Sequence, residues 1–397
     1  MSYPALVLPA LLAFAGNGTS RTAWTTPSAS EVDAIYPDIE ALYIDLHQNP
    51  ELGFQEVETA SKLAARVKAL GYEVTTGVGR TGIVAVLKNG PGTTVMLRTE
   101  LDALPVEEKT GLPFASKAVV RNADGQLTPV MHACGHDIHM AAWAGAARLM
   151  AEHRDRWHGT LMLVGQPAEE GLGGAAAMLK DGLFARFPRP DFALSLHDDD
   201  TMPAGTIGYH AGPFRARADA VTIIVHGRGG HAAMPMNTVD PIVLAARIVL
   251  ALQTIVSREN NPTDPVVITV GSIHGAAPRE PEVGVPSNVD AAVVYNDPAL
   301  TLRLARALRA GLGDKNVVEM PAKMTSEDFS AYWVTGKVPS ALLHIGAVNP
   351  ARFEEIRKSG IPGPAPHSAQ WAPDREPTLK GAVRAEVTEL LELFKGQ

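Results

Sequence analysis

The sequence has only one cysteine, no basic run and no long apolar segment, and each of these features excludes a class of structure or function. A single cysteine among 397 residues excludes a disulfide within the chain. A formal net charge of -8, without any Lys/Arg-rich run, gives no positive field for a phosphate backbone, so nucleic-acid binding is not expected. No apolar stretch reaches the roughly 20 residues that a bilayer-spanning helix needs, so no membrane span is predicted.

The remaining composition is that of a large folded protein. Hydrophobic residues make up 46% and charged residues 20% of the chain, so burial should be ample. A length of 397 residues exceeds one typical core and predicts two domains of unequal size, although a single large enzyme would also fit.

Residues 1–30 are predicted to lie outside the folded part, as a signal segment and linker. An apolar run ends in Ala13-Phe14-Ala15, which has the A-x-A form of a signal-peptidase site. We therefore expect export to a periplasmic location, with a cytoplasmic location as the alternative because no basic residue precedes the run and Pro9 interrupts it. A disordered tail would also explain this segment.

From Glu31 the sequence alternates between helical and strand-like segments. Helices are predicted at 31–47, 56–70 and 141–153 from their apolar spacing. Short apolar runs predict buried strands at Ile83–Leu87, Val95–Leu97, Leu161–Val164 and Phe192–Leu196. This alternation predicts an α/β fold with a mixed sheet flanked by helices, formed by residues 31–210 and 326–397.

Residues 211–325 are predicted to form a smaller α+β domain inserted into the larger one. Its expected strands and helices lie at 220–225, 241–257, 266–270, 289–294 and 298–310. Both helices open with Asp-Pro, an N-cap followed by the proline favoured at the first helical position. With a closing strand at Val317-Val318, this order predicts a ferredoxin-like domain.

A dense cluster of metal-ligand side chains lies in the segment MHACGHDIH. Five candidate ligands fall within eight residues: His132, Cys134, His136, Asp137 and His139. Spacing of this density favours a metal site. Two alternatives stay open at this point, a buried histidine cluster satisfied by hydrogen bonds and a thiol nucleophile at Cys134.

Two adjacent glutamates, Glu169 and Glu170, follow an apolar strand, at the end of the sheet where α/β sites are built. Neighbouring side chains of extended backbone point to opposite sides, so one carboxylate can bind a metal while the other faces an attacking water as general base. The alternative is that Glu169 and Glu170 are a solvated surface pair, but the apolar strand that precedes these glutamates disfavours it.

Other strand ends carry further ligand-type side chains. His197 follows an apolar strand, and His367 lies in a Pro/Gly-rich loop before the last helix. Asp102 closes another strand, where its carboxylate could hydrogen-bond a ligating imidazole and fix its tautomer. Either histidine could instead be structural, and Arg98 and Glu100 beside Asp102 could form an internal ion pair. The convergence of such side chains predicts a single site.

Taken together, these segments resemble the amidohydrolase branch of the aminoacylase/carboxypeptidase metallopeptidase family, which includes hippurate hydrolases and plant enzymes that release auxin from amino-acid conjugates. The resemblance covers nearly all of residues 31–393. It rests on RTELDALP, MHACGHD, QPAEE, SLH, GRGGHAAMP, TSEDFS and PHSAQW, in the family's order.

The resemblance implies a site with two divalent cations, zinc or manganese first and cobalt or nickel as alternatives. The implied metal ligands are Cys134, His136, Glu170, His197 and His367. Glu169 would be the general base and Asp102 would support the site. His231 would stabilise an oxyanion from the neighbouring chain, within a homodimer formed by the inserted domain, and Asn288 is a candidate for substrate binding.

The sequence departs from the family pattern at three places. Glu100 stands where an aspartate is usual, and Met236 replaces a histidine near the expected substrate. The Asn-x-Ile-Pro and Gly-Thr-x-Arg patterns are blurred to VGVPSNVD and VVYND, so we expect the substrate's carboxylate to be recognised differently. The implied activity is hydrolysis of N-acyl amino acids or related small amides. The alternatives are a dipeptidase or carboxypeptidase, and a metal-holding binding protein without catalysis.

Overall fold

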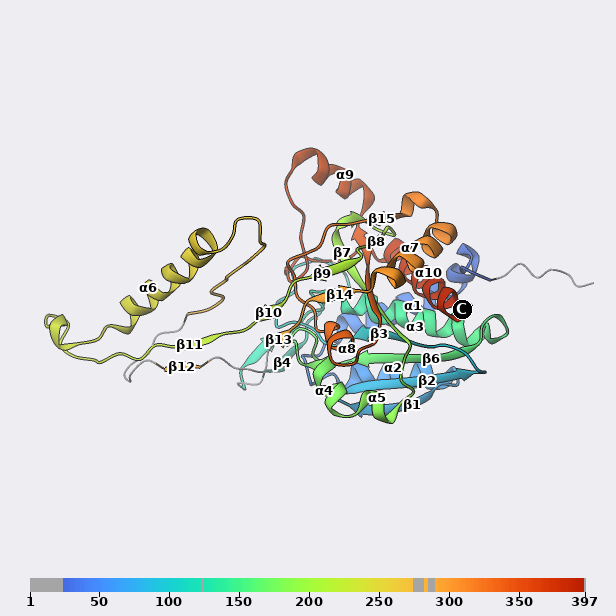
Figure 1. The fold of residues 1–397 in the computed structure, drawn as a ribbon, viewed down its shortest axis with the longest axis horizontal. Helices are drawn as coiled ribbons and strands as arrows, with labels where there is room; N and C mark the ends of the chain where they lie inside the picture. Colours follow the sequence, from blue (N-terminus) through green and yellow to red (C-terminus); the bar gives the residue numbers. More distant parts are fainter. Residues whose placement is uncertain (1–23, 123–124, 274–281, 285–289, 396–397) are drawn as a thin grey trace, which may run out of the picture.

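A mixed sheet of eight strands forms the centre of the larger part of the molecule (Figure 1). The computed structural model describes residues 24–122, 125–273, 282–284 and 290–395. In spatial order the strands are β1 (Glu73–Val78), β2 (Gly82–Asn89), β6 (Gly159–Gln166), β3 (Thr94–Glu100), β7 (Phe192–Pro203), β16 (Ser340–Val348), β8 (Ile207–Tyr209) and β15 (Val317–Glu319). The four central strands β6, β3, β7 and β16 run parallel to one another, so their carboxyl ends meet at one edge of the sheet.

Alternating side chains of the strands build one hydrophobic core on each face of the sheet. Ile83, Ala85 and Leu87 of β2 face one way, and Val84 and Val86 face the other. The first face is covered by the long helices α1 (Ala29–Gln48), α2 (Val57–Ala69), α3 (His136–Glu152), α7 (Pro298–Leu312) and α10 (Arg375–Phe394). The second is covered by the short helices α4 (Gly174–Lys180), α5 (Leu183–Arg186) and α8 (Ser330–Val334). The predicted mixed sheet flanked by helices is thereby confirmed.

The predicted helices and strands of this part agree with the structure, with two differences. Helix α3 begins at His136 and not at Ala141, so this candidate ligand lies in its first turn. Strand β7 does not end at Leu196 but continues to Pro203, so His197 lies within the strand. The aspartates that follow look like a loop in the sequence. The first two are buried because Asp198 bonds Trp371 and Asp199 bonds His344, which replaces their contacts with water.

The expected ferredoxin-like domain differs from the structure in two of its elements. Helix α7 packs against α10, with Leu300, Leu304 and Leu308 in the core of the large sheet, and β15 pairs in parallel with β8. The assignment of these two elements to the inserted domain is therefore wrong. The physical reason is that an apolar stripe predicts a helix with one buried face, but not the surface on which it packs.

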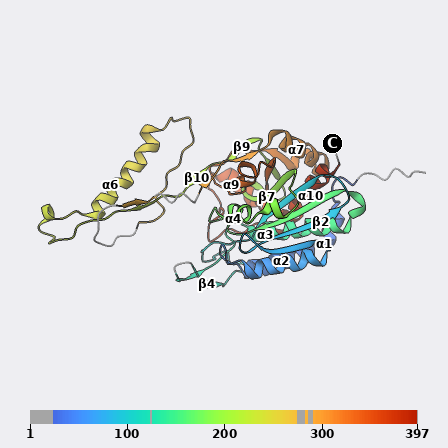
Figure 2. The same cartoon turned by 60° about the horizontal axis from the view of Figure 1, so that its bottom comes forward.

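Two further strands of the predicted insertion, β9 (Gly212–Arg215) and β14 (Val294–Asn296), pair with each other and pack in the second core. The described residues of 218–291 form an arm that extends away from the sheet in both views (Figures 1 and 2). Its elements are β10 (Ala218–Asp219), β11 (Thr222–Ile224), a 3-10 turn (Pro235–Asn237), α6 (Pro241–Thr254), a π-helical turn (Ile255–Glu259), β12 (Glu282–Gly284) and β13 (Asp290–Ala291). Strand β11 pairs with β12 and β10 with β13. The strand expected at 266–270 is not formed. That this segment is a separate domain stays a prediction.

Helix α6 is apolar but lies outside both cores. None of its residues is buried, and the side chain of Leu250 is 69% exposed. Together with the turn that follows, Pro241–Glu259 is 19 residues long with a mean hydropathy of 1.5, which passes the length and composition test for a membrane span. One such helix is weak support for a span, since helices of other origin pass the same test.

Candidate metal centre

The carboxyl edge of the parallel strands gathers the side chains that the sequence singled out. Asp102 follows β3, Glu169 and Glu170 follow β6, and His197 lies in β7. Cys134 and His136 stand beside these strands at the start of α3. This is the edge at which sites of open α/β sheets form, because the chain leaves each strand there in a loop.

A tight turn at Gly135 sets Cys134 and His136 side by side. Gly135 has a φ of 76°, a left-handed conformation that glycine adopts without strain. The carboxylate of Asp198 contacts the position that a side-chain β-carbon would take, so no other residue fits here. As a result, one ligand atom each from Cys134, His136 and His197 lie within 4.8 Å of one another.

The other predicted ligands join this group. The Sγ of Cys134 lies 3.5 Å from Nε2 of His197. The Nε2 of His136 lies 3.8 Å from Glu169 and 3.9 Å from Glu170, and the Nε2 of His367 lies 3.3 Å from Glu170. The structure thus brings together all five predicted ligands and the predicted base, while their roles stay predictions.

Backbone carbonyls fix which nitrogen of each imidazole faces the cluster. The Nδ1 of His136 lies 2.7 Å from the carbonyl oxygen of Asp102, and the Nδ1 of His197 lies 2.8 Å from that of Asp198. Since a carbonyl only accepts, each Nδ1 carries a hydrogen, and Nε2 is the nitrogen that faces the cluster and can bind a metal ion once it is unprotonated. Both imidazoles are therefore already oriented for binding a metal ion.

Several buried polar atoms in the cluster are unsatisfied. Within the described ranges, Nε2 of His136 and Oε1 of Glu170 are buried and have no hydrogen-bond partner. Buried polar atoms normally have a partner, and a cation would satisfy both of these at once. A donor set of imidazole, thiolate and carboxylate suits divalent transition metals, so the residues fit the metal site that the sequence predicts.

Burial also shapes the charges of this cluster. It raises the pKa of the Cys134 thiol and of Glu169 well above their ordinary values, and it raises the pKa of Glu170 to about 7. Neighbouring carboxylates, Glu327 for Glu169 and Asp102 for Glu170, add to this rise. A bound cation would favour the ionised forms, because it supplies the opposite charge that the buried cluster lacks.

Contrary to the expectation from the sequence, the carboxylate of Asp102 does not hydrogen-bond a ligating imidazole. The ring of His136 bonds its backbone carbonyl, whereas the nearest carboxylate oxygen is 3.6 Å from Nδ1. The two carboxylate oxygens accept the backbone N–H groups of Glu169 and Glu170, each at 3.0 Å. Asp102 therefore holds the glutamate loop in place, a loop in which Ala168 has a positive φ of 45°.

The remaining candidates of the segment MHACGHDIH face other partners. Asp137 lies 2.6 Å from His47. His139 donates through Nδ1 to Glu100 at 3.0 Å and accepts through Nε2 from the N–H of Asp198 at 2.8 Å, so neither nitrogen is available for a metal. His132 is buried without a hydrogen-bond partner among the described residues, and no structural role for it is evident.

Glu100 also forms the internal ion pair that the sequence left open as an alternative. It bonds Arg98, whose guanidinium further contacts Glu327 at 2.9 Å and Asp328 at 3.2 Å. This explains the TSEDFS segment, whose two carboxylates neutralise a buried arginine beneath the site. All four side chains are buried, so these ion pairs fix the strand ends against one another.

Sequence reasoning missed three polar residues around the ligands. Asp198 accepts the indole N–H of Trp371 at 3.0 Å, and His344 pairs in register with His197, with ring centroids 5.7 Å apart. The segment around His344 looks like an ordinary buried strand. Its position opposite His197 depends on the pairing of β7 with β16, which the sequence does not display.

Two predicted residues are not part of the cluster. His231 is exposed in the arm, where its Nδ1 accepts the N–H of Ala233 at 3.1 Å. Nothing in this single chain brings it to the other site residues. Asn288 lies outside the described residues.

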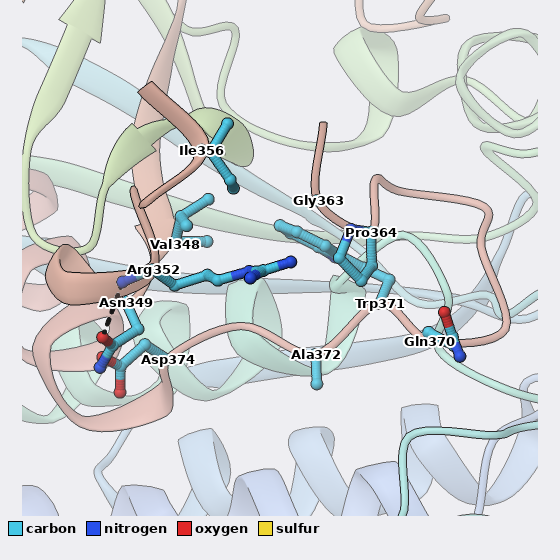
Figure 3. A pocket seen from close by; sticks show the side chains of 11 residues that line it. Val348, Asn349, Arg352, Ile356, Gly363, Pro364, Gln370, Trp371, Ala372 and Asp374 are labelled. Atoms are coloured by element: carbon cyan, nitrogen blue, oxygen red, sulfur yellow. Dashed lines mark hydrogen bonds between the residues drawn. The ribbon is translucent and has the colours of Figure 1, made fainter. Parts of the chain in front are cut away.

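A cavity of about 260 Å³ is lined by the end of β16, by α9 (Pro350–Ser359) and by the segment on either side of His367. Its lining consists of Ala347, Val348, Asn349, Arg352, Ile356, Gly363, Pro364, Gln370, Trp371, Ala372 and Asp374. In Figure 3 the Arg352 side chain extends across it towards Pro364. None of the predicted ligands lines the cavity, but Trp371 joins it to Asp198.

Comparison with known proteins places this geometry in a family. The chain is 40% identical over 233 residues to N-acetyl-L-cysteine deacetylase from Bacillus subtilis, covering 58% of the chain and 53% of that relative. It is 30% identical over 420 aligned positions to an IAA-amino acid hydrolase from Arabidopsis thaliana, covering 95% of the chain and 90% of that relative. The chain thus spans about half the length of the first of these relatives.

A solved structure extends the comparison to the fold. A dinuclear metal binding peptidase of the M20 family from Bacillus subtilis superimposes with a TM-score of 0.64 at 25% identity, covering 91% of the chain and 99% of that structure. The sequence profile of peptidase family M20/M25/M40 matches residues 96–357, which is more than half of the chain. The profile and the two relatives confirm the resemblance drawn from the motifs, and the chain belongs to peptidase family M20/M25/M40.

Proposed function

We propose that this protein is a metal-dependent amidohydrolase that cleaves the amide bond of N-acyl amino acids or related small amides. The observation that carries this proposal is the convergence of Cys134, His136 and His197 on one point, beside the buried Glu169 and the partly buried Glu170. The two relatives named above act, by their names, on an N-acetyl amino acid and on an acyl-amino acid conjugate. Their acyl groups differ, which supports the reaction type but not one acyl group.

We further propose that the cluster holds two divalent ions. The named metallopeptidase structure is dinuclear, and the five ligand side chains here are enough to hold two ions if one of them bridges. Bound ions would supply a Lewis acid that polarises the scissile carbonyl and lowers the pKa of a bound water. Zinc or manganese is proposed first, with cobalt and nickel as alternatives of similar ligand preference.

Glu169 is proposed to move the proton. Its Oε2 lies 3.8 Å from Nε2 of His136, which places it at the edge of the ligand group. Burial raises its pKa well above the ordinary value, with the charge of Glu327 adding to the rise, which favours the protonated form that the carboxyl group needs in order to pass a proton on. It would take a proton from the attacking water and pass it to the leaving amine, as the C–N bond breaks.

His231 and the arm are proposed to act between two copies of the chain. His231 is exposed and far from its own cluster in sequence and contacts, while α6 beside it presents an unburied apolar face. A homodimer formed through this arm would cover that face and let His231 stabilise the oxyanion in the partner's site. Export to the periplasm also remains a proposal, since residues 1–23 lie outside the described part of the chain.

A dipeptidase or carboxypeptidase is the second candidate, because the dinuclear structural neighbour is named a peptidase. The two functions can be distinguished by comparing kcat/KM for acyl amino acids with kcat/KM for dipeptides. Hydrolysis of N-acetyl and N-benzoyl amino acids at much higher kcat/KM than dipeptides would support the amidohydrolase, and the reverse order would support the peptidase.

The test of the site is the Glu169→Gln variant. Loss of the base should lower kcat on the order of 100-fold or more while the metal content of the purified protein stays unchanged. Glu107→Gln is the matched control, because its side chain is 70% exposed and lies outside the cluster. Turnover within a few fold of wild type would overturn the assignment. A metal-loaded wild type that hydrolyses neither panel would instead indicate a binding protein.

A further inference from the structure

Arg215, at the end of β9 (Gly212–Arg215), is a buried arginine without a carboxylate partner. The residue is only 6% exposed. Its Nη1 donates to the carbonyl oxygen of Ser326 at 3.3 Å and its Nη2 donates to Nε2 of His344 at 3.1 Å. Its Nε has no hydrogen-bond partner, and no Asp or Glu oxygen of the described residues lies within 4.0 Å of the guanidinium.

Arg98, a second buried arginine near the site, has the carboxylate partners that Arg215 lacks. Arg98 is also buried, but Glu100, Glu327 and Asp328 surround its guanidinium. A buried cation without an opposite charge is unfavourable unless a partner compensates it. Arg98 has its partners within the fold, whereas the partner of Arg215 has to come from outside the fold.

The hydrogen-bond network of Arg215 and His344 leads to one carboxylate, Asp199, whose charge already has a partner. Asp199 lies 2.5 Å from Nδ1 of His344 and 2.6 Å from Nζ of Lys323. Because a guanidinium nitrogen only donates, Nε2 of His344 accepts from Arg215, and Nδ1–H donates to Asp199, so this ring carries no charge of its own. The Lys323 charge balances Asp199, and the charge of Arg215 remains uncompensated.

Arg215 is connected to the candidate metal centre through His344. The ring of His344, to which it donates, stacks on the ring of His197 with centroids 5.7 Å apart. The guanidinium therefore lies one imidazole ring away from a predicted metal ligand.

We propose that Arg215 binds the carboxylate of the amino-acid half of the substrate and so makes the enzyme specific for N-acyl amino acids over uncharged amides. A guanidinium is permanently charged and offers paired N–H donors that match a carboxylate. The proposal rests on the proposed amidohydrolase function. It also answers a question from the sequence, since the usual arginine-containing pattern is blurred to VVYND.

The test measures binding instead of turnover. In a metal-loaded Glu169→Gln background, the Kd of an N-acetyl amino acid and of its carboxamide analogue are compared by calorimetry, with Arg215 intact or changed to Met or Lys. With Arg215 intact, the acid should bind on the order of 10- to 100-fold tighter than the amide. Arg215→Met should abolish this preference while the amide Kd stays within about twofold.

Arg217→Met is the control, because this arginine is two residues away and its side chain is 57% exposed. It should leave both dissociation constants unchanged. Arg215→Lys keeps the charge without the paired donors and should retain part of the preference, which also covers the case that the Met variant does not fold.

Two results would overturn the proposal. Equal weakening of acid and amide in the Arg215 variants would mean that the guanidinium contacts the amide carbonyl or only supports the fold. An unchanged preference would mean that the carboxylate is bound elsewhere. Failure of the proposed function is distinguishable, because it would show as Arg215-dependent binding of the acid without any hydrolysis by the wild type.

Discussion

Glu389 in α10 should make the folded state less stable as the pH rises, and Glu389→Gln should remove this effect. Glu389 is fully enclosed between α10 and its neighbours, and both of its carboxylate oxygens are buried without a hydrogen-bond partner among the described residues. Burial raises its pKa from 4.5 to about 8. In the folded state the carboxyl group therefore keeps its proton over a pH range in which the unfolded chain has already lost it.

The size of the effect follows from these two pKa values. Between pH 4.5 and about 8 the folded state binds one proton more than the unfolded state, so the free energy of unfolding falls as the pH rises. Each pH unit in this window is worth about 1.4 kcal/mol, which gives on the order of 5 kcal/mol across the window. That is a large share of the roughly 5 to 15 kcal/mol that typically stabilise a folded protein.

The assay is urea unfolding at several pH values between 5 and 8, with wild type and Glu389→Gln compared at each. The variant should gain stability over wild type progressively, by several kcal/mol at pH 8 relative to pH 5. Glu376→Gln on the same helix is the control, since its side chain is 58% exposed. A stability difference between Glu389→Gln and wild type that does not change with pH would refute the reasoning.

Two further predictions concern the site and its partner. Asp102→Asn leaves one acceptor oxygen where two backbone N–H groups now bind. It should lower the free energy of unfolding by about 1 to 3 kcal/mol, measured by urea unfolding, and it should also lower kcat. Unchanged values of both quantities would contradict the role given to this carboxylate. His231→Ala should reduce kcat about 100- to 1000-fold. Mixing His231→Ala with Glu169→Gln should restore part of the activity through mixed dimers, and a lack of any recovery would speak against action between chains.

The sequence predicted the central sheet because its strands are buried on both faces and therefore stand out as short apolar runs. The ligands were predictable for a related reason: Cys134, His136, Glu170 and His367 are polar residues in segments that follow or separate such runs. The packing of α7 was not predictable, since its apolar stripe fits any complementary surface. Arg215 was missed because its significance is the absence of a partner, which appears only after the neighbouring carboxylates are placed.

The carbonyl contacts of His136 and His197 have a consequence for how metal ions enter and leave. Both rings are oriented by the backbone before any ion arrives, so binding need not freeze these side chains and little rotational entropy is lost. The carbonyl of Asp198 lies in β7 and that of Asp102 follows β3, and both strands are held by sheet hydrogen bonds and by the hydrophobic core. Removing the ions should therefore leave the protein folded with the metal site preorganised, and different divalent ions should exchange at this site reversibly.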